Sequence, residues 1–401
     1  MLRYFFGFLI FLLLMAAAYY FIGLPPSTIE EKKTEATPIV LGFVGPLSGN
    51  LISVKNSVEL AVGDLKTQGK NINVFYEDGK CGGDEARVAL TKLINEQKVR
   101  VVIGGVCSGE TLAMAPLVEE KSVVLLSPSA SSPEITKAGT FVFRNNPSDT
   151  SAGRVLGKFL TDQYKNLIIV SENNEFSQNL RLVFLENYKG DGKNILVDEV
   201  LPDTEDAKEL KPIITKIKEA KKSEAVLIAA QSEVLAGTLV KEMAAAKINL
   251  PLFIHLLPTG SKFLETAGKA AEGIIFTDLP SVNLNSARVL TFLEDYKKNY
   301  GLPAGGQEFY MAAAYDAVNI LAQATEKVGS ESVRIRDYLY SLSEFYGLIG
   351  KYSFDLNGDV VGVSWALKKI KDGRIENHPE EVVVTITTTA TTTTSTTTQK
   401  R

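Results

Sequence analysis

Small hydroxyl-bearing residues gather directly after two apolar runs of this 401-residue chain. Residues 101–103 lead into Gly-Gly-Val-Cys-Ser-Gly, and residues 123–126 lead into Ser-Pro-Ser-Ala-Ser-Ser-Pro. Such apolar runs are typical of strands buried on both faces of a parallel sheet. These sheets bind ligands at the carboxyl ends of their strands, where backbone N–H groups point outward. Ser108, Ser129 and Ser131 are therefore predicted to bind a small anion such as a carboxylate, unless both clusters are ordinary strand-to-helix turns.

Strand-like and helix-like segments alternate through most of the chain. The expected strands are residues 39–44, 72–76, 101–104, 123–126, 167–170, 195–200, 225–229, 252–254 and 274–277. This alternation indicates parallel sheets built from right-handed crossovers. One continuous sheet of so many strands would be unusual, so we predict two α/β lobes. The first crossing between them is expected at residues 141–149, where Ser148 or Asp149 caps the next helix.

Helices are expected between most of the strands and after the last one. They are residues 54–65, 84–96, 152–164, 180–188, 207–220, 234–246, 287–300 and 307–328. The last two are expected to return to the first lobe. A closing hairpin over residues 352–361 carries Asn357-Gly358, a signal for a tight turn. Its acidic residues resemble the start of a calcium loop, but Ala366 stands where such a loop needs glutamate, so we assign a turn.

Composition and charge narrow the class of protein. With 22% charged residues, 45% hydrophobic residues and a net charge of −4, the chain has no basic excess that would favour nucleic acid. Its two histidines, His255 and His378, are far apart in the sequence. Sequence motifs of hydrolases, zinc peptidases and nucleotide-binding loops do not occur. We therefore expect a binding protein and not an enzyme, with no cofactor and no metal.

Both ends of the chain indicate export. Residues 4–24 are almost wholly apolar and long enough to span a bilayer. Residues 1–24 are thus expected to be a membrane anchor, or a signal peptide cleaved near Ala16-Ala17-Ala18. A linker over 25–37 follows, and residues 380–401 form a threonine-rich tail, either an O-glycosylated stalk or an unmodified disordered terminus. The protein is expected at the cell surface, or secreted if the first segment is cleaved.

Cys81 and Cys107 are the only cysteines. In an exported protein an even pair suggests a disulfide. If the strands that precede them are neighbours, both cysteines lie at the same edge of the sheet. The alternative is two free buried thiols.

Several short segments carry a family resemblance that runs from about residue 38 to residue 375. The opening Ile-Val-Leu-Gly-Phe-Val-Gly-Pro-Leu-Ser-Gly resembles the first strand and loop of type I periplasmic solute-binding proteins, in the branch that binds leucine, isoleucine and valine for ABC importers. Further segments in the family's order are Arg-Asn-Asn-Pro-Ser-Asp at 144–149, Ala-Glu-Gly-Ile-Ile at 271–275, Tyr-Asp-Ala-Val at 315–318 and Phe-Asp-Leu-Asn-Gly at 354–358. The resemblance implies two Rossmann-like lobes with parallel sheets, joined by a three-crossing hinge. The implied lobes are 38–146 with 278–346, and 147–277 with 347–379.

The same resemblance implies a ligand-binding site and a disulfide between Cys81 and Cys107. Ser108 matches a serine that binds the ligand carboxylate, and Ser129 and Ser131 match a loop that binds the ligand's ammonium and carboxylate groups. Phe176 matches an aromatic residue of the second lobe that covers the ligand. The full set of implied ligand-binding residues is Ser108, Ser129, Ser131, Phe176, Gln231 and Tyr310, with Gln231 replacing a family aromatic residue.

One departure from the family concerns the ligand's ammonium group. Its acidic partner should fall near residues 255–258, which read His-Leu-Leu-Pro and contain no acid. Either another acid replaces it, with Glu175 and Glu233 as candidates, or the ligand lacks an α-ammonium group. We expect free leucine, isoleucine and valine to bind weakly or not at all.

The resemblance implies capture of a small solute, an amino acid or a related carboxylate, by hinge closure. A monomer would then deliver the solute to an ABC permease. The alternative is the ligand-sensing ectodomain of a receptor with the same fold.

Overall fold

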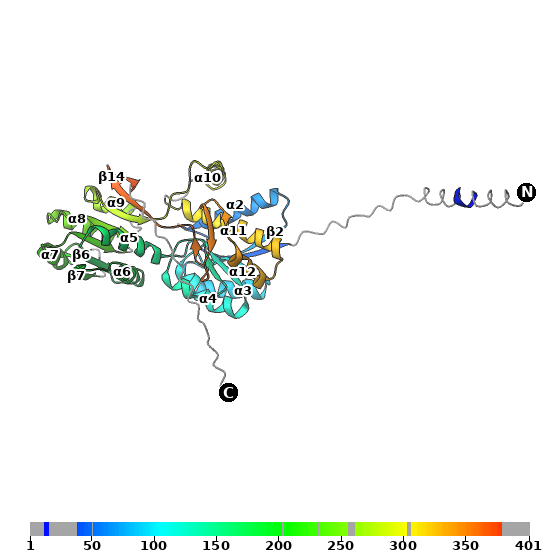
Figure 1. Ribbon diagram of the computed structural model, residues 1–401, viewed down its shortest axis with the longest axis horizontal. Coiled ribbons are helices and arrows are strands. Elements are labelled where there is room, and N and C mark those ends of the chain that lie inside the picture. Colours follow the sequence, from blue (N-terminus) through cyan, green and yellow to red (C-terminus); the bar gives the residue numbers. More distant parts are fainter. Residues whose placement is uncertain are drawn as a thin grey trace, which may run out of the picture. The chain divides into compact units, whose positions relative to one another are not determined.

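Two sheets built mainly of parallel strands organise the chain (Figure 1). The computed structural model describes residues 12–15, 38–49, 51–202, 204, 206–230, 232–255, 261–302 and 306–378, and of residues 175, 176 and 261 the backbone alone. Apart from the helical residues 12–15, the expected anchor, the linker and the threonine-rich tail lie outside the described residues. Within the described ranges, no helix has both the length and the apolar character that a membrane crossing needs.

The first sheet contains five parallel strands in the order β2-β1-β3-β4-β5. They are β1 (Ile39–Gly45), β2 (Ile72–Asp78), β3 (Val101–Gly104), β4 (Val124–Ser127) and β5 (Val142–Arg144). Successive apolar side chains alternate between two cores, so that Ile103 belongs to one core and Val102 to the other. Burial on both faces explains the continuous apolar runs in these strands.

Helices cover both faces of this sheet. α2 (Ile52–Thr67) and α11 (Glu308–Val328) pack together on one face. α3 (Gly83–Asn95) and α4 (Ser108–Lys121) pack on the other. α4 begins directly at Ser108, so its free backbone N–H groups lie at the carboxyl edge of the sheet.

The second sheet contains seven strands in the order β15-β14-β10-β9-β8-β6-β7. They are β6 (Asn166–Glu172), β7 (Asn194–Leu201), β8 (Ala225–Ala229), β9 (Leu252–His255), β10 (Ile275–Asp278), β14 (Ala366–Lys371) and β15 (Arg374–Asn377). β6 to β10 pair in parallel, whereas β14 and β15 are antiparallel. The side chains of one face form a core with α5 (Asp149–Gln163) and α6 (Glu175–Asn187). Those of the other face pack against α7 (Lys211–Glu219), α8 (Glu233–Ala245) and α9 (Ser261–Ala267).

The chain passes between the two sheets three times, after β5, after β10 and before β14. Between the last two crossings, α10 (Ala287–Tyr300) packs on α2, and α12 (Ser332–Ser341) packs on α11. A small antiparallel sheet of β11 (Phe345–Tyr346), β12 (Lys351–Phe354) and β13 (Val360–Val361) follows. The predicted fold class, two α/β lobes with parallel sheets, is confirmed.

The segment from 347 to 361 contacts α11 and β5 of the first lobe, whereas the lobe boundaries expected from sequence place it in the second lobe. The fully buried guanidinium of Arg144 in β5 donates from Nε to Oδ1 of Asp359 at 2.6 Å. The backbone N–H of Arg144 also donates to the carbonyl of Gly358 at 2.9 Å. The turn at Asn357-Gly358 is confirmed, because Oδ1 of Asp355 accepts from the backbone N–H groups of Asn357 and Asp359.

Most predicted strands lie within two residues of the observed ones, but α4 was not expected. Two of its buried positions are the polar residues Glu110 and Thr111, and Pro116 lies inside the helix, so the sequence lacks a clear apolar face. Ser148, one of the two expected caps, accepts from the backbone N–H of Thr150 and begins α5.

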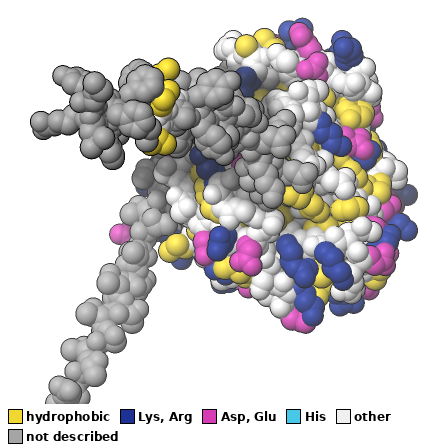
Figure 2. Space-filling view, turned by 90° about the vertical axis from the view of Figure 1, so that its right-hand side faces the viewer, with side chains coloured by type: hydrophobic (Ala, Val, Ile, Leu, Met, Phe, Trp, Pro, Cys, Tyr) yellow, Lys and Arg dark blue, Asp and Glu magenta, His cyan; other side chains and the backbone are white. Residues whose placement is uncertain are grey.

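On the face that Figure 2 shows, basic and acidic side chains are interspersed.

Candidate functional site

A cavity of about 630 Å³ lies where loops from the two sheets meet. Its walls come from the carboxyl ends of strands in both lobes. Ser108 follows β3, Ser131 follows β4, and Asp149 follows β5 in the first lobe. His255 ends β9 and Asp278 ends β10 in the second lobe. This is the edge at which open α/β sheets bind ligands.

The three serines singled out from sequence line this one cavity, and hydrogen bonds join the two loops that carry them. Oγ of Ser108 accepts hydrogen bonds from the backbone N–H groups of Ser131 at 3.3 Å and Ser132 at 3.2 Å. The hydroxyl of Ser129 donates to the carbonyl of Val106 at 2.6 Å. The two loops therefore form one unit, in which the Ser108 hydroxyl proton is left to donate to a ligand.

Asp149 and His255 connect the serine loops with the second lobe. Oδ2 of Asp149 accepts from the hydroxyl of Ser131 at 3.0 Å, and its Oδ1 lies 3.4 Å from Nε2 of His255. Nδ1 of His255 is 2.6 Å from Oγ1 of Thr277. The ring of Trp365, in the third crossing, packs edge-on against the imidazole, with 4.7 Å between the two ring centroids. Asp149 and His255 are almost fully buried, so this contact is shielded from bulk solvent.

Two further carboxylates line the second-lobe side of the cavity. Oδ2 of Asp278 accepts from Nζ of Lys368 at 2.6 Å, and both side chains are largely buried. Glu233, in the first turn of α8, accepts from the backbone N–H of Phe263 at 3.1 Å. Of the two candidates for the missing acid, Glu233 lines the cavity, whereas the side chain of Glu175 lies outside the described residues.

Of the remaining predicted site residues, Tyr310 at the start of α11 lines the cavity. Burial, Asp149 and Asp278 all raise the pKa of Tyr310, so its hydroxyl stays protonated at neutral pH. The side chain of Phe176 and the whole of Gln231 lie outside the described residues.

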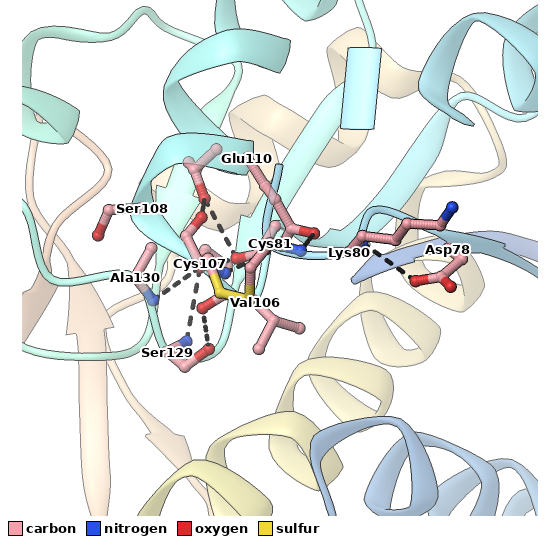
Figure 3. The surroundings of a disulfide bond; sticks show 12 residues. Asp78, Lys80, Cys81, Val106, Cys107, Ser108, Glu110, Ser129 and Ala130 are labelled. Atoms are coloured by element: carbon pink, nitrogen blue, oxygen red, sulfur yellow. Dashed lines mark hydrogen bonds between the residues drawn. A yellow bond between two sulfur atoms is a disulfide. The ribbon is translucent and has the colours of Figure 1, made fainter. Parts of the chain in front are cut away.

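A disulfide joins Cys81 to Cys107 beneath the Ser108 loop (Figure 3). The strands that precede the two cysteines are not neighbours, but each pairs with β1, so their carboxyl ends lie at the same edge. The buried carboxylate of Glu110 joins the same segments, accepting from the backbone N–H of Cys81 at 2.9 Å and of Cys107 at 3.0 Å. Burial raises the pKa of Glu110, and the N–H groups of Cys107, Cys81 and Val106 oppose that shift.

Comparison with known proteins places the chain in a family. A family model described as "Periplasmic binding protein" matches residues 38–374. The chain belongs to this family. As a periplasmic binding protein, it is 25% identical over 291 residues to the "Leucine-, isoleucine-, valine-, threonine-, and alanine-binding protein" of Pseudomonas aeruginosa, which covers 72% of this chain and 75% of that relative. It is 24% identical over 349 residues to a Leu/Ile/Val-binding protein of Rhizobium johnstonii, covering 84% and 93% of the two chains.

Solved structures of periplasmic binding proteins share the fold. An ABC transporter substrate-binding protein from Desulfitobacterium hafniense aligns with a TM-score of 0.72 and 26% identity. The alignment covers 85% of this chain and 100% of that protein. The branched-chain amino acid transporter substrate-binding protein LivJ of Streptococcus pneumoniae, solved with isoleucine, aligns with a TM-score of 0.69 and 25% identity, covering 84% and 98%. These relatives are named as binding proteins, in agreement with the expectation that the chain is not an enzyme.

Sequence reasoning missed two residues that line the cavity of this periplasmic binding protein, Asp149 and His255, and the partner of a third, Lys368 beside Asp278. The sequence indicates Asp149 only as a helix cap, and no second histidine lies near His255 in the chain. Lys368 lies in β14, which pairs with the end of β10. The turn Asn-Asn-Pro-Ser-Asp at the first crossing was a signal for Asp149, since a polar residue just after a strand lies at the ligand-binding edge.

Proposed function

We propose that this chain is an exported solute-binding protein that captures an amino acid or a related carboxylate for an ABC permease. The observation that carries the proposal is the single cavity lined by Ser108 and Ser131 from the first lobe and by His255 and Asp278 from the second. Membership of the periplasmic binding protein family and the names of the relatives support it.

The ligand carboxylate binds at the serine end in this proposal. The N-terminus of α4 offers free backbone N–H groups and the positive end of the helix dipole. The hydroxyl of Ser108 can donate to the carboxylate while it continues to accept from the Ser131 and Ser132 backbones. Ser129 and Ser131 complete this end of the site.

Capture proceeds by closure of the lobes. The ligand makes contacts with both lobes only when they meet, so its binding favours the closed state. Tyr310 forms part of the wall, and Phe176 and Gln231 complete the second-lobe side, as their positions in the family pattern indicate. We assign residues 38–146 and 279–361 to the first lobe and residues 147–278 and 362–378 to the second.

Export and attachment form part of the same proposal. Residues 1–24 direct the chain across the membrane and hold it at the cell surface, or are cleaved to release it. The threonine-rich tail lies outside the cell, and the protein acts as a monomer that binds no nucleic acid.

The decisive experiment identifies the solute carried by the protein. The full-length chain is purified under native conditions and denatured, and the released small molecules are analysed by mass spectrometry. An amino acid or small carboxylate, released in about equimolar amount and rebound by the refolded chain, is the expected result. Failure of any amino acid or carboxylate to be released or to bind would overturn the proposal, and unchanged solute uptake in cells lacking the protein would refute the transport role.

A further inference from the structure

The cavity has an excess of negative charge. Four carboxylates line it, from Glu134, Asp149, Glu233 and Asp278. Among the described lining residues there is no lysine or arginine. A ligand that closes the lobes must therefore balance the charges that the protein itself leaves unbalanced.

Two of the four carboxylates have basic partners supplied by the protein. Asp278 is paired with Lys368 at 2.6 Å, so this couple contributes no net charge. Asp149 lies 3.4 Å from His255 and also accepts from the Ser131 hydroxyl. These two acids are thus held by their neighbours before a ligand arrives.

The other two have only neutral donors within the part of the chain that the structure describes. Glu134 is exposed and accepts from Nδ2 of Asn179 at 3.2 Å and from the hydroxyl of Ser132 at 3.3 Å. Glu233 is half-buried, and its Oε2 accepts from the backbone N–H of Phe263. It lies in the first turn of α8, near the positive end of that helix's dipole.

The anion-binding end of the cavity and Glu233 belong to different lobes. Ser108 and the N-terminus of α4 lie on the first sheet, whereas Glu233 begins a helix that packs on the second. Apolar side chains of Leu112, Leu180 and Leu279 also line the cavity and suit a methylene chain. An extended ligand with a carboxylate at one end and a cation at the other would contact both lobes.

Given the proposed function, we propose that the solute is an amino acid with a cationic side chain, whose cation pairs with Glu233. Closure removes water from the cavity, and a carboxylate left there without a cation is unfavourable. A side-chain ammonium or guanidinium satisfies Glu233 by a charge-assisted hydrogen bond, which a leucine side chain cannot form. An acidic side chain would add repulsion.

The test compares ligands that differ by one charged group. L-lysine, L-arginine, L-norleucine and cadaverine are titrated into the purified full-length chain by calorimetry. Norleucine retains the α-amino acid group but lacks the side-chain ammonium, and cadaverine lacks the carboxylate. We expect lysine or arginine to bind at least about tenfold more tightly than norleucine, the ratio that one charge-assisted contact provides.

The variant Glu233→Gln tests the assigned partner. Glutamine keeps an oxygen that can accept from Phe263 but loses the charge, so the preference for lysine over norleucine should fall by at least about tenfold. Norleucine affinity should fall less than lysine affinity, and the thermal unfolding temperature should stay unchanged. Glu294→Gln, at an exposed position of α10, is the matched control and should change neither affinity.

The outcomes separate this inference from the proposed function. If norleucine binds as tightly as both basic amino acids, or if Glu233→Gln keeps the preference, the inference is overturned and the proposed function stands. If cadaverine binds as well as lysine, the cation is supported and the carboxylate end of the proposed function fails. If none of the four binds, the inference is overturned, and the solute released from the native protein decides the proposed function.

Discussion

Oδ1 of Asp149 lies 3.4 Å from Nε2 of His255, and this contact joins the beginning of α5 to the end of β9. Because Oδ2 of the same carboxylate accepts from the Ser131 hydroxyl, a single buried side chain links the serine loops of the first lobe to the second sheet. The Asp149 side chain therefore lies at the point where the two lobes meet around the cavity.

Removal of that carboxylate should destabilise the fold. We expect Asp149→Ala to lower the free energy of unfolding by about 1–3 kcal/mol, since the half-buried Ser131 hydroxyl and the buried imidazole each lose a partner. Asp149→Asn, which can still accept from Ser131, should cost less. Urea denaturation measures both changes, with Asp162→Ala at an exposed position of the same helix as control. Equal effects of Asp149→Ala and Asp162→Ala would contradict this role.

The serine loops should contribute directly to ligand affinity. Ser108→Ala and Ser131→Ala are each expected to weaken binding by about 1.5–3 kcal/mol if the hydroxyl meets a charged carboxylate. Calorimetry with the solute released from the native protein gives the affinities, and circular dichroism checks the fold. Ser341→Ala, exposed at the end of α12, should bind like the parent. Parental affinity in both loop variants would place the binding site elsewhere.

The disulfide and Glu110 should make separable contributions. Reduction of Cys81–Cys107 is expected to lower the free energy of unfolding by about 3.5 kcal/mol through the entropy of the opened loop. The Ser108 loop should stay ordered after reduction, because the Glu110 carboxylate still accepts from the backbones of both cysteines.

Hydrogen exchange at residues 107–109 distinguishes the contribution of the disulfide from that of Glu110. Glu110→Gln places an amide nitrogen, a donor, against one of the two N–H groups, so it should speed exchange there more than reduction does. Glu120→Gln, exposed on the same helix, serves as control. Faster exchange after reduction than in Glu110→Gln would show that the disulfide alone orders the loop.

Asp316 should make stability depend on pH. Burial raises the pKa of Asp316 to about 7, against the opposing effect of its hydrogen bonds from the Ile349 and Leu348 backbones. An unfolded aspartate titrates near pH ~3.9, so between about pH 4 and pH 7 the folded chain holds the extra proton. Asp316 therefore contributes its full share to the free energy of unfolding below about pH 4. This share is lost as pH rises through about 7, at up to about 1.4 kcal/mol per pH unit.

The pH effect is measured by urea denaturation of the parent and Asp316→Asn across this window. The difference in unfolding free energy between the two proteins should change with pH, whereas the exposed control Asp162→Asn should follow the parent. A constant difference across the window would refute the assignment.

The fold could be predicted from sequence to a large extent, because local patterns carry it. The apolar runs that became β3 and β8 were placed at their observed bounds, and Asn357-Gly358 marked its turn. α4 was missed because Glu110 is buried for a reason remote in sequence, the backbone of Cys81. The serine loops of the candidate site could be predicted, since the serines follow strands directly in the chain. The ion pair of Asp278 with Lys368 could not be predicted, because the two residues meet only through the pairing of β14 with β10.

The antiparallel β14 has a consequence for the order in which the molecule can be completed. β10 borders open space until residues 366–371 pair with it, and Asp278 at the end of β10 gains its ammonium partner from that same late segment. Likewise, α11 covers a face of the first sheet whose strands all precede residue 145. During synthesis from the N-terminus, neither lobe can therefore complete its fold before the C-terminal third of the chain has been made. A partly exported chain would expose apolar strand faces and lack a complete cavity. Chaperones that bind unfolded chains should therefore bind it until its last strands emerge.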